Sequence, residues 1–211
     1  RAEGGWVDLA SRERQSRRPS YLRLLRDPVL RGVPHRPRAA RHRHLLDRVR
    51  AVREVLPETP IIVDANEGWE IPMVECFATE LKKLQVQLVE QPLPQADDAA
   101  LADVAHPVPF CADESCHTSG DIAHLKGRYD VINIKLDKTG GLTEALKLRQ
   151  AAIDVGMDVM VGCMVATSLS MAPSVLVAQG AVIVDLDGPL LLAKDRDMGL
   201  TYDESGQVHP P

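Results

Sequence analysis

Six short apolar segments, each rich in β-branched residues, recur along the chain and alternate with longer amphipathic segments. The short segments have the length and composition of buried strands, and the longer ones place apolar side chains at helical spacing. Strands that alternate with helices in this way form a parallel sheet through right-handed crossovers. The predicted strands are 61–63, 86–89, 108–112, 131–134, 159–162 and 182–184, and the predicted helices are 45–56, 72–84, 97–104, 121–126, 142–155 and 169–179.

The even spacing of these strands favours a (β/α) barrel over an open, doubly wound sheet. The chain also lacks the glycine-rich fingerprint expected of a dinucleotide-binding open sheet. A complete barrel has eight strands in about 250 residues, whereas this chain has 211 residues. We therefore expect an α/β fold with an incomplete barrel of about six of the eight strands, which lacks the first two and ends in an irregular segment at 190–211.

Charge divides the chain sharply. Residues 1–53 contain 15 arginines, no lysine and five acidic residues, so their net charge is +10, while residues 54–211 carry −15. We expect 1–44 to be an irregular Arg-rich leader and 45–211 to be the partial barrel domain. The leader could be a disordered basic tail, or a nucleic-acid-binding segment, which the absence of interleaved aromatic residues disfavours. We favour a third interpretation, an irregularity of the reading frame, because a GC-rich gene read out of frame yields Arg, Pro and His.

The composition excludes several classes of protein. No apolar run approaches the roughly 18 residues that a membrane span needs, and the N-terminal residues lack the apolar core of a signal peptide. The four cysteines do not have the paired spacing of a zinc site. We therefore expect reduced thiols in a cytoplasmic protein.

Polar side chains stand at the ends of four consecutive predicted strands. Asp64, Glu90, Asp113 and Lys135 are separated by 26, 23 and 22 residues, about one strand–helix repeat each time. In a parallel barrel these side chains emerge on one face, where active sites lie. Three gathered carboxylates repel one another and are costly to desolvate, and a hard divalent cation such as Mg²⁺ offsets that cost. Any one of these acids alone fits a helix cap or a solvated turn, but together they predict a magnesium site.

Lys135 follows a buried strand at the predicted mouth of the barrel. By itself it is more typical of a surface lysine after a core strand. Beside a metal ion it becomes a candidate general base, because burial and a neighbouring cation both lower the pKa of an amine. The matching substrate is a carbon acid whose α-proton is acidified when its carboxylate binds Mg²⁺.

Six motifs occur in the order VDANEGW, LVEQPLP, CADES, NIKLDKTGG, MVGCM and DLDGPLLL. Over residues 45–211 this text resembles the muconate-lactonizing subgroup of the enolase superfamily, and most closely the L-Ala-D/L-Glu (dipeptide) epimerases. The resemblance implies that Asp64, Glu90 and Asp113 are the Mg²⁺ ligands. It also implies that Lys135 is the acid/base lysine, for which Lys138 is the competing candidate.

The same resemblance assigns substrate-binding roles. It implies that Asp185 and Asp187 bind the ammonium group of the dipeptide, and the alternative for this pair is a turn or helix-cap role. Cys163 and Met164, at the mouth of the barrel by position, are expected to shape the pocket. With Lys138 they complete the expected substrate-binding set.

The reaction implied by the resemblance is a Mg²⁺-assisted 1,1-proton transfer at the Glu α-carbon of L-Ala-D/L-Glu, in the recycling of peptidoglycan peptides. The expected protein is thus an isomerase with a small-molecule substrate. Neither nucleic acid nor a membrane is expected as a partner, and a homo-oligomer is left open. One alternative is a racemase of N-acyl amino acids such as N-acetylglutamate. The alternative of another class is a catalytically inactive fragment or pseudoenzyme.

Two features of the resembled family are not found. Its members have an N-terminal α+β capping domain, which residues 1–44 do not resemble, and a second lysine in a Lys-x-Lys motif on the second strand. No lysine precedes Lys82, so the base for the opposite face of the α-carbon is missing. We expect an N-terminally truncated chain that exchanges the α-proton from one side and epimerises poorly.

Overall fold

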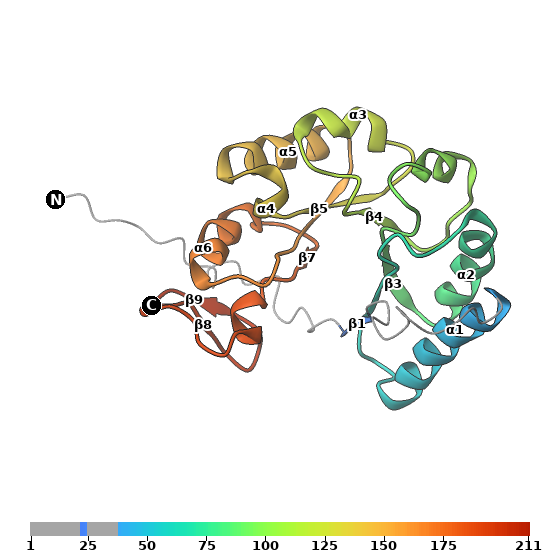
Figure 1. Cartoon of the computed structure of the whole chain (residues 1–211), viewed down its shortest axis with the longest axis horizontal. Coiled ribbons are helices and arrows are strands. Elements are labelled where there is room, and N and C mark those ends of the chain that lie inside the picture. Colours follow the sequence, from blue (N-terminus) through green and yellow to red (C-terminus); the bar gives the residue numbers. More distant parts are fainter. Residues whose placement is uncertain (1–21, 25–37) are drawn as a thin grey trace.

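The computed structural model describes residues 22–24 and 38–211, with side chains from residue 45 onward. Seven parallel strands form one sheet in which every strand lies beside its neighbours in sequence. The sheet curves, and the helices lie along its outer side (Figure 1). Its strands are β1 (Leu22–Leu24), β2 (Ile61–Asp64), β3 (Val86–Glu90), β4 (Phe110–Ala112), β5 (Val131–Ile134), β6 (Asp158–Val161) and β7 (Ile183–Val184).

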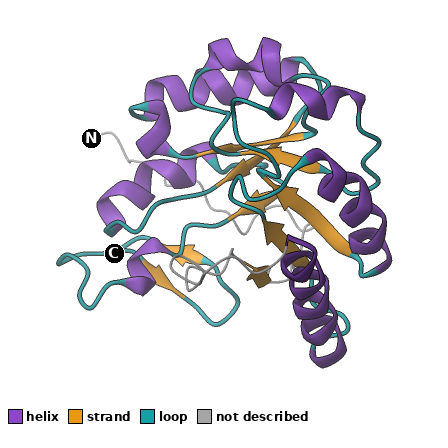
Figure 2. Cartoon of the chain, turned by 45° about the vertical axis from the view of Figure 1, so that its right-hand side comes forward, coloured by secondary structure: helices purple, strands orange, loops and turns teal. Residues whose placement is uncertain are grey.

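Helices connect successive strands and cover one face of the sheet (Figure 2). Among the described residues no helix is both long and apolar enough to cross a membrane. The α-helices are α1 (Arg38–Val55), α2 (Ile71–Lys83), α3 (Ile122–Leu125), α4 (Leu136–Thr139), α5 (Leu142–Asp154) and α6 (Ser168–Val177), and the 3₁₀ helices are η2 (Asp98–Asp103), η3 (Ser119–Asp121) and η4 (Gly188–Leu191).

The predicted incomplete barrel is confirmed. Strands β2–β7 correspond one to one with the six predicted strands, and their order and parallel direction are those of a (β/α) barrel. Among the described strands, β1 and β7 stand at the two ends of the sheet and do not pair with each other. The result is a curled, open sheet with its carboxyl-terminal strand ends along one rim.

Both terminal segments contain elements that the sequence analysis does not predict. Strand β1 and the start of α1 at Arg38 lie within the predicted irregular leader, while the remainder of that leader lies outside the described residues. β1 pairs in parallel with β2, placing Leu22 beside Ile61. In the closing segment, Thr201–Tyr202 (β8) and Val208–His209 (β9) form an antiparallel pair. These strands are two or three residues long, too short for periodicity to reveal them.

Two apolar clusters hold the sheet. The larger one fills the space between the sheet and its helices. Helix α2, for example, contributes Val74, Phe77 and Leu81 to it, at helical spacing. Because side chains alternate along a strand, the other face of the sheet carries a second cluster. It takes one buried residue from each of β2–β7: Ile62, Leu88, Cys111, Val131, Met160 and Ile183. All four cysteines of the chain are free thiols, as predicted.

Candidate active site

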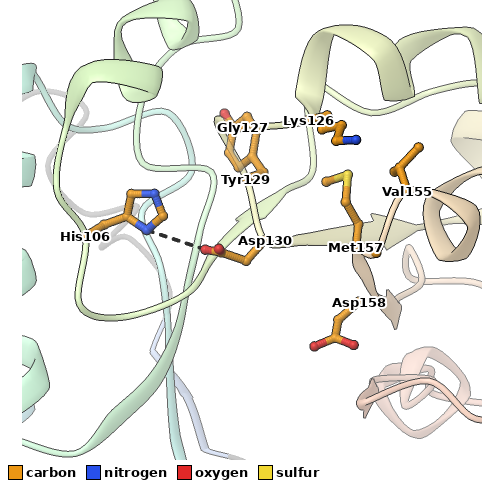
Figure 3. A pocket seen from close by; sticks show the side chains of 9 residues that line it. His106, Lys126, Gly127, Tyr129, Asp130, Val155, Met157 and Asp158 are labelled. Carbon is orange, nitrogen blue, oxygen red and sulfur yellow. Dashed lines mark ion pairs between the residues drawn. The ribbon is translucent and has the colours of Figure 1, made fainter.

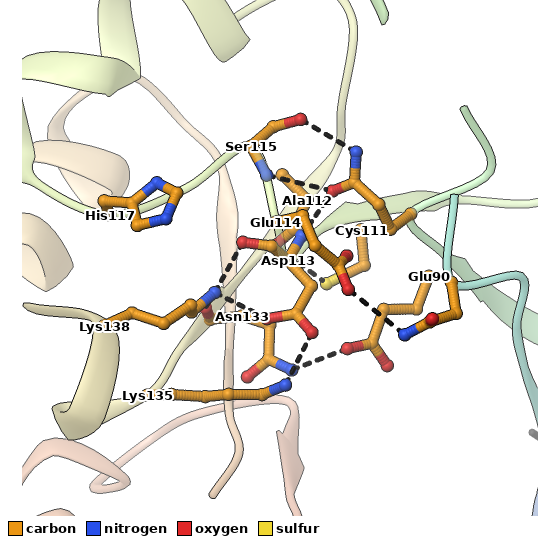
Figure 4. Close-up of polar contacts among 12 residues, drawn as sticks. Glu90, Cys111, Ala112, Asp113, Glu114, Ser115, His117, Asn133, Lys135 and Lys138 are labelled. Carbon is orange, nitrogen blue, oxygen red and sulfur yellow. Dashed lines mark hydrogen bonds and ion pairs between the residues drawn. The ribbon is translucent and has the colours of Figure 1, made fainter. Parts of the chain in front are cut away.

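The four predicted strand-end residues lie at the carboxyl ends of adjacent strands. Asp64 and Glu90 are the last residues of β2 and β3 and stand opposite each other in the ladder. Asp113 directly follows β4, and Lys135 directly follows β5. All four are buried, with exposed fractions of 0–7%. The sequence spacing therefore brings three acids and one amine to the same rim, with Asp113, Lys135 and Glu90 shown in Figure 4.

Two ammonium groups converge on Asp113. Lys135 Nζ donates to Asp113 Oδ2 at 2.5 Å, and Lys138 Nζ donates to Asp113 Oδ1 at 2.5 Å. The two lysines reach the same acceptor because the short helix α4 begins directly after Lys135, and residues three apart on a helix face the same way. Burial by itself raises the pKa of Asp113, but the charges of Lys138 and Lys135 outweigh it and lower the pKa.

Lys138 Nζ makes three hydrogen bonds, and the one to Asp113 Oδ1 is only the first of them. Its ammonium group also donates to the backbone oxygens of Asp113, at 2.5 Å, and of Asn133, at 3.0 Å. An ammonium group has three N–H donors, and Lys138 uses all three to tie α4 to β5 and to the end of β4. This arrangement favours Lys135 over Lys138 as the candidate base.

Glu90 is positioned by a neutral amide that the sequence analysis does not identify. Asn133, in the middle of β5, donates from Nδ2 to Glu90 Oε1 at 2.8 Å, and both residues are fully buried. Gly162 makes room for this amide, since a Cβ atom there would lie 2.7 Å from Asn133 Oδ1. Sequence alone gives only a weak signal for this role, a polar residue inside an otherwise apolar strand.

Backbone strain is concentrated just beyond β2 and β3. Asn66, Glu67 and Gln91 all have positive φ angles, of 46°, 58° and 36°, a region that residues other than glycine rarely occupy. The Asn66 amide N–H donates to Asp64 Oδ1 at 2.8 Å, and its side chain donates to Glu114 Oε1 at 3.1 Å. Strained residues of this kind cluster at functional sites, and here they lie within three residues of two of the candidate ligands.

The chemistry of these side chains suits a hard divalent cation, although their present arrangement does not form a metal site. Buried carboxylates on three adjacent strand ends offer only oxygen ligands, which Mg²⁺ prefers. No group of three His, Cys, Asp or Glu side chains within the described residues is arranged closely enough to hold a metal ion. Asp113 instead forms ion pairs with Lys135 and Lys138. These two lysines supply the positive charge that a buried carboxylate requires.

Four of the five predicted substrate-binding residues follow β6 and β7, whereas the fifth, Lys138, lies in α4 after β5. Asp185 follows β7, and its N–H donates to the Val161 oxygen at the end of β6. Cys163 is half-buried, and burial raises the pKa of its thiol, which the charges of Asp185 and Asp187 raise further. Met164, in contrast, is 53% exposed. Cys163 thus lies within electrostatic reach of both aspartates, while Met164 forms part of the outer surface.

A cavity of about 400 Å³ lies elsewhere on the molecule (Figure 3). Asp130, directly before β5, and Asp158, the first residue of β6, line it together with His106. His106 Nδ1 is 3.4 Å from Asp130 Oδ2. These residues mark the amino ends of the strands, opposite the rim that carries the acids. The cavity is therefore separate from the candidate active site.

The chain matches the family model described as enolase C-terminal domain-like over residues 23–210. It is 51% identical over 166 residues to an N-acetyl-D-glutamate racemase from Pseudoalteromonas sp. It is 46% identical over 167 residues to an L-Ala-D/L-Glu epimerase from Escherichia coli. Each match covers 79% of this chain and 52% of the relative, so the chain spans about half the length of these relatives.

Solved structures give the same likeness. An enolase family member from Agrobacterium tumefaciens, with homology to dipeptide epimerases and with bound sodium and L-Ala-L-Glu, superposes with a TM-score of 0.75 at 57% identity. This match covers 78% of the present chain and 50% of that one. A dipeptide epimerase from Cytophaga hutchinsonii, complexed with Mg and D-Ala-L-Val, has a TM-score of 0.74 at 28% identity. This match covers 81% of the present chain and 49% of that one.

Proposed function

Because the chain belongs to the enolase C-terminal domain-like family, we propose that it carries the catalytic rim of an isomerase that moves the proton α to a carboxylate. L-Ala-D/L-Glu dipeptides are the proposed substrates. The observation that carries the proposal is the burial of Asp64, Glu90, Asp113 and Lys135 together at the carboxyl ends of adjacent strands. Such a cluster is costly in a fold unless it serves binding or catalysis.

In this proposal Asp64, Glu90 and Asp113 hold Mg²⁺. When bound, the cation stabilises the negative charge that develops on the substrate carboxylate as the α-proton leaves. Asn133 keeps Glu90 turned toward the rim through its 2.8 Å hydrogen bond. The Asn66 N–H does the same for Asp64.

Lys135 is the proposed base that removes the α-proton. Only a neutral amine accepts a proton, so its 2.5 Å contact with Asp113 has to open before Lys135 can act. Lys138, which keeps two further hydrogen bonds to backbone oxygens, remains in place as the positive partner of Asp113. We therefore assign proton transfer to Lys135 and a structural role to Lys138.

Asp185 and Asp187 are the proposed partners of the ammonium group of the dipeptide. The charge of two carboxylates beside Cys163 suits a cation on the substrate. The second candidate function is racemisation of an N-acyl amino acid, which the 51% identity to an N-acetyl-D-glutamate racemase favours. An N-acetyl substrate has no ammonium group, so the preference between the two substrates separates the two functions.

The reaction is proposed to occur in the cytoplasm, during recycling of peptidoglycan peptides, a setting with which four free thiols are compatible. Residues 1–211 contain no lysine before Lys82. This chain is therefore proposed to supply one base, so exchange of the α-proton with solvent should exceed inversion at the α-carbon.

Deuterium exchange tests this function. L-Ala-L-Glu and N-acetyl-L-glutamate are incubated separately with the chain and Mg²⁺ in D₂O, and deuterium at the Glu α-carbon is followed by mass spectrometry, with chiral analysis of the product. We expect exchange into the dipeptide that exceeds inversion and that Lys135→Ala abolishes. Exchange that survives Lys135→Ala assigns the base elsewhere, and faster exchange into N-acetyl-L-glutamate selects the second candidate function.

A further inference from the structure

We propose that Gln91 is a positioning residue that fixes the backbone on which Asp113 is carried. Gln91 directly follows Glu90 at the end of β3 and is fully buried. Its side chain crosses to the segment that follows β4, where Asp113 begins a turn. The part of this inference that concerns Mg²⁺ rests on the proposed function, whereas the part that concerns the backbone does not.

The carbonyl end of the Gln91 side chain holds the turn. Oε1 accepts from the backbone N–H groups of Asp113, at 2.8 Å, and Ser115, at 3.2 Å. The Cys116 N–H closes the same turn on the Asp113 oxygen at 3.0 Å. Both N–H groups bound by Gln91 are buried, so losing their acceptor leaves two unsatisfied donors.

The amide end fixes the direction of the side chain. Nε2 lies 2.9 Å from the Leu93 oxygen, 2.8 Å from Ser115 Oγ and 3.0 Å from the Tyr129 hydroxyl. The Tyr129 hydroxyl in turn donates to Asp98 Oδ2 at 3.2 Å. An amide NH₂ group has two donors and no acceptor. The three oxygen atoms around it therefore fix Nε2 on their side and leave Oε1 to face Asp113.

The backbone of Gln91 connects the remaining ligand segments. Its N–H donates to the Cys111 oxygen at 2.8 Å, and its own oxygen accepts from the Glu67 N–H, beyond Asp64, at 2.9 Å. It is thus bonded to the segments that follow β2 and β4 while standing at the end of β3. The φ angle of 36° that this position requires is unfavourable for any residue except glycine. Glycine would relieve this strain, but it has no side chain to make the hydrogen bonds of Oε1 and Nε2.

A purely structural role for Gln91 predicts a different outcome from a positioning role. If the buried network only adds stability, every break in it acts alike. We therefore compare Gln91→Met, which keeps the length of the side chain but removes both amide functions, with Tyr129→Phe. The Tyr129→Phe variant removes one hydroxyl from the same network on the side away from Asp113. Gln91→Gly serves as a further variant that removes the side chain together with the backbone strain.

The first readout is hydrogen exchange of individual amides in the metal-free protein, measured by NMR. Gln91→Met and Gln91→Gly should speed exchange at Asp113 and Ser115 about tenfold or more relative to Tyr129→Phe, as expected when a buried donor loses its acceptor. If these two amides exchange equally fast in Gln91→Met and in Tyr129→Phe, the inference is overturned. Should Gln91→Met not fold, the same comparison is made between Gln91→Gly and Tyr129→Phe.

The second readout is Mg²⁺ affinity, measured by titration calorimetry with MgCl₂ alone. Gln91→Met should weaken Mg²⁺ binding about tenfold, while Tyr129→Phe should leave it within about twofold of the unmodified chain. An unmodified chain that binds no Mg²⁺ contradicts the proposed function, and the amide exchange then still decides the role of Gln91. An equal loss of affinity in both variants contradicts the positioning role.

Discussion

Asp113 is the residue on which the charged contacts of the candidate active site converge. It is buried and accepts from two ammonium groups. Its neighbour Glu114 is half-buried and accepts at Oε1 from the neutral side-chain amide of Asn66. The two carboxylates have pKa values shifted in opposite directions. The charges of Lys138 and Lys135, opposing burial, lower the pKa of Asp113, whereas burial raises that of Glu114.

These shifts predict opposite pH dependences of stability. The folded-state pKa of Asp113 lies below its ordinary value of 3.8, so its contribution to stability is complete above that pH and is lost as the pH falls through the folded value. Asp113→Asn should therefore flatten the loss of stability in acid and cost about 3 kcal/mol at neutral pH, because two buried ammonium groups lose their partner. Urea unfolding at a series of pH values, without metal, measures both effects.

The matched control is the adjacent carboxyl group. The folded-state pKa of Glu114 is raised, so ionisation costs stability as the pH rises through and above its ordinary value of 4.5. Glu114→Gln should remove that cost and leave the acid limb of the curve unchanged. If Asp113→Asn and Glu114→Gln change the pH profile in the same direction, the charge arrangement described for Asp113 is wrong.

At the scale of elements, strands β5 and β6 meet at a close contact between Gly162 and Asn133. A Cβ atom at position 162 would lie 2.7 Å from Asn133 Oδ1 and 2.9 Å from Nδ2. Gly162→Ala should therefore displace the amide from Glu90 and destabilise the fold by about 1–3 kcal/mol, the usual cost of overpacking. Chemical denaturation measures this loss.

Gly120, in η3, provides the control for that substitution. A Cβ atom there would meet only Thr118 Oγ1, at an ordinary contact distance of 3.5 Å. Gly120→Ala should change the stability by less than about 1 kcal/mol. If Gly162→Ala and Gly120→Ala change the stability equally, the close contact with Asn133 is not the reason why position 162 needs glycine.

The strands and the candidate ligands could be predicted from sequence because each depends on local pattern. Asp64, Glu90 and Asp113 follow apolar runs at one-repeat intervals, and parallel strands bring such positions to one rim. Gln91 and Asn133 could not be predicted in this way, because their roles arise from partners on other strands. β1 was missed for a related reason: its three residues gain their strand conformation from pairing with β2.

At the scale of the whole molecule, the open sheet has consequences for association. Among the described strands β7 has one sheet neighbour, β6, and its residue Val184 is 46% exposed. Nearby α6 and η4 also expose Leu169, at 65%, and Leu190, at 62%. An unpaired parallel edge beside apolar side chains is a template for pairing with another chain. We therefore predict self-association of this chain through the β7 edge.

Sedimentation velocity over a range of protein concentrations measures this association. Val184→Lys places a charge on the edge and should shift the chain toward the monomer without lowering its unfolding midpoint. Val55→Lys, at a residue that is 77% exposed on α1, is the control and should leave association unchanged. Association that is unaffected by Val184→Lys would assign the contact to another surface.

The central claim, that three acids at one rim share a magnesium ion beside Lys135, is tested most directly by titrating Mg²⁺ into the chain and four single variants. Asp64→Asn, Glu90→Gln and Asp113→Asn should each weaken binding at least about tenfold, since each removes a charged ligand. Lys135→Ala should leave the affinity nearly intact, because the amine is a base and not a ligand. Binding that none of the three acid variants weakens, or that Lys135→Ala abolishes, would contradict the account.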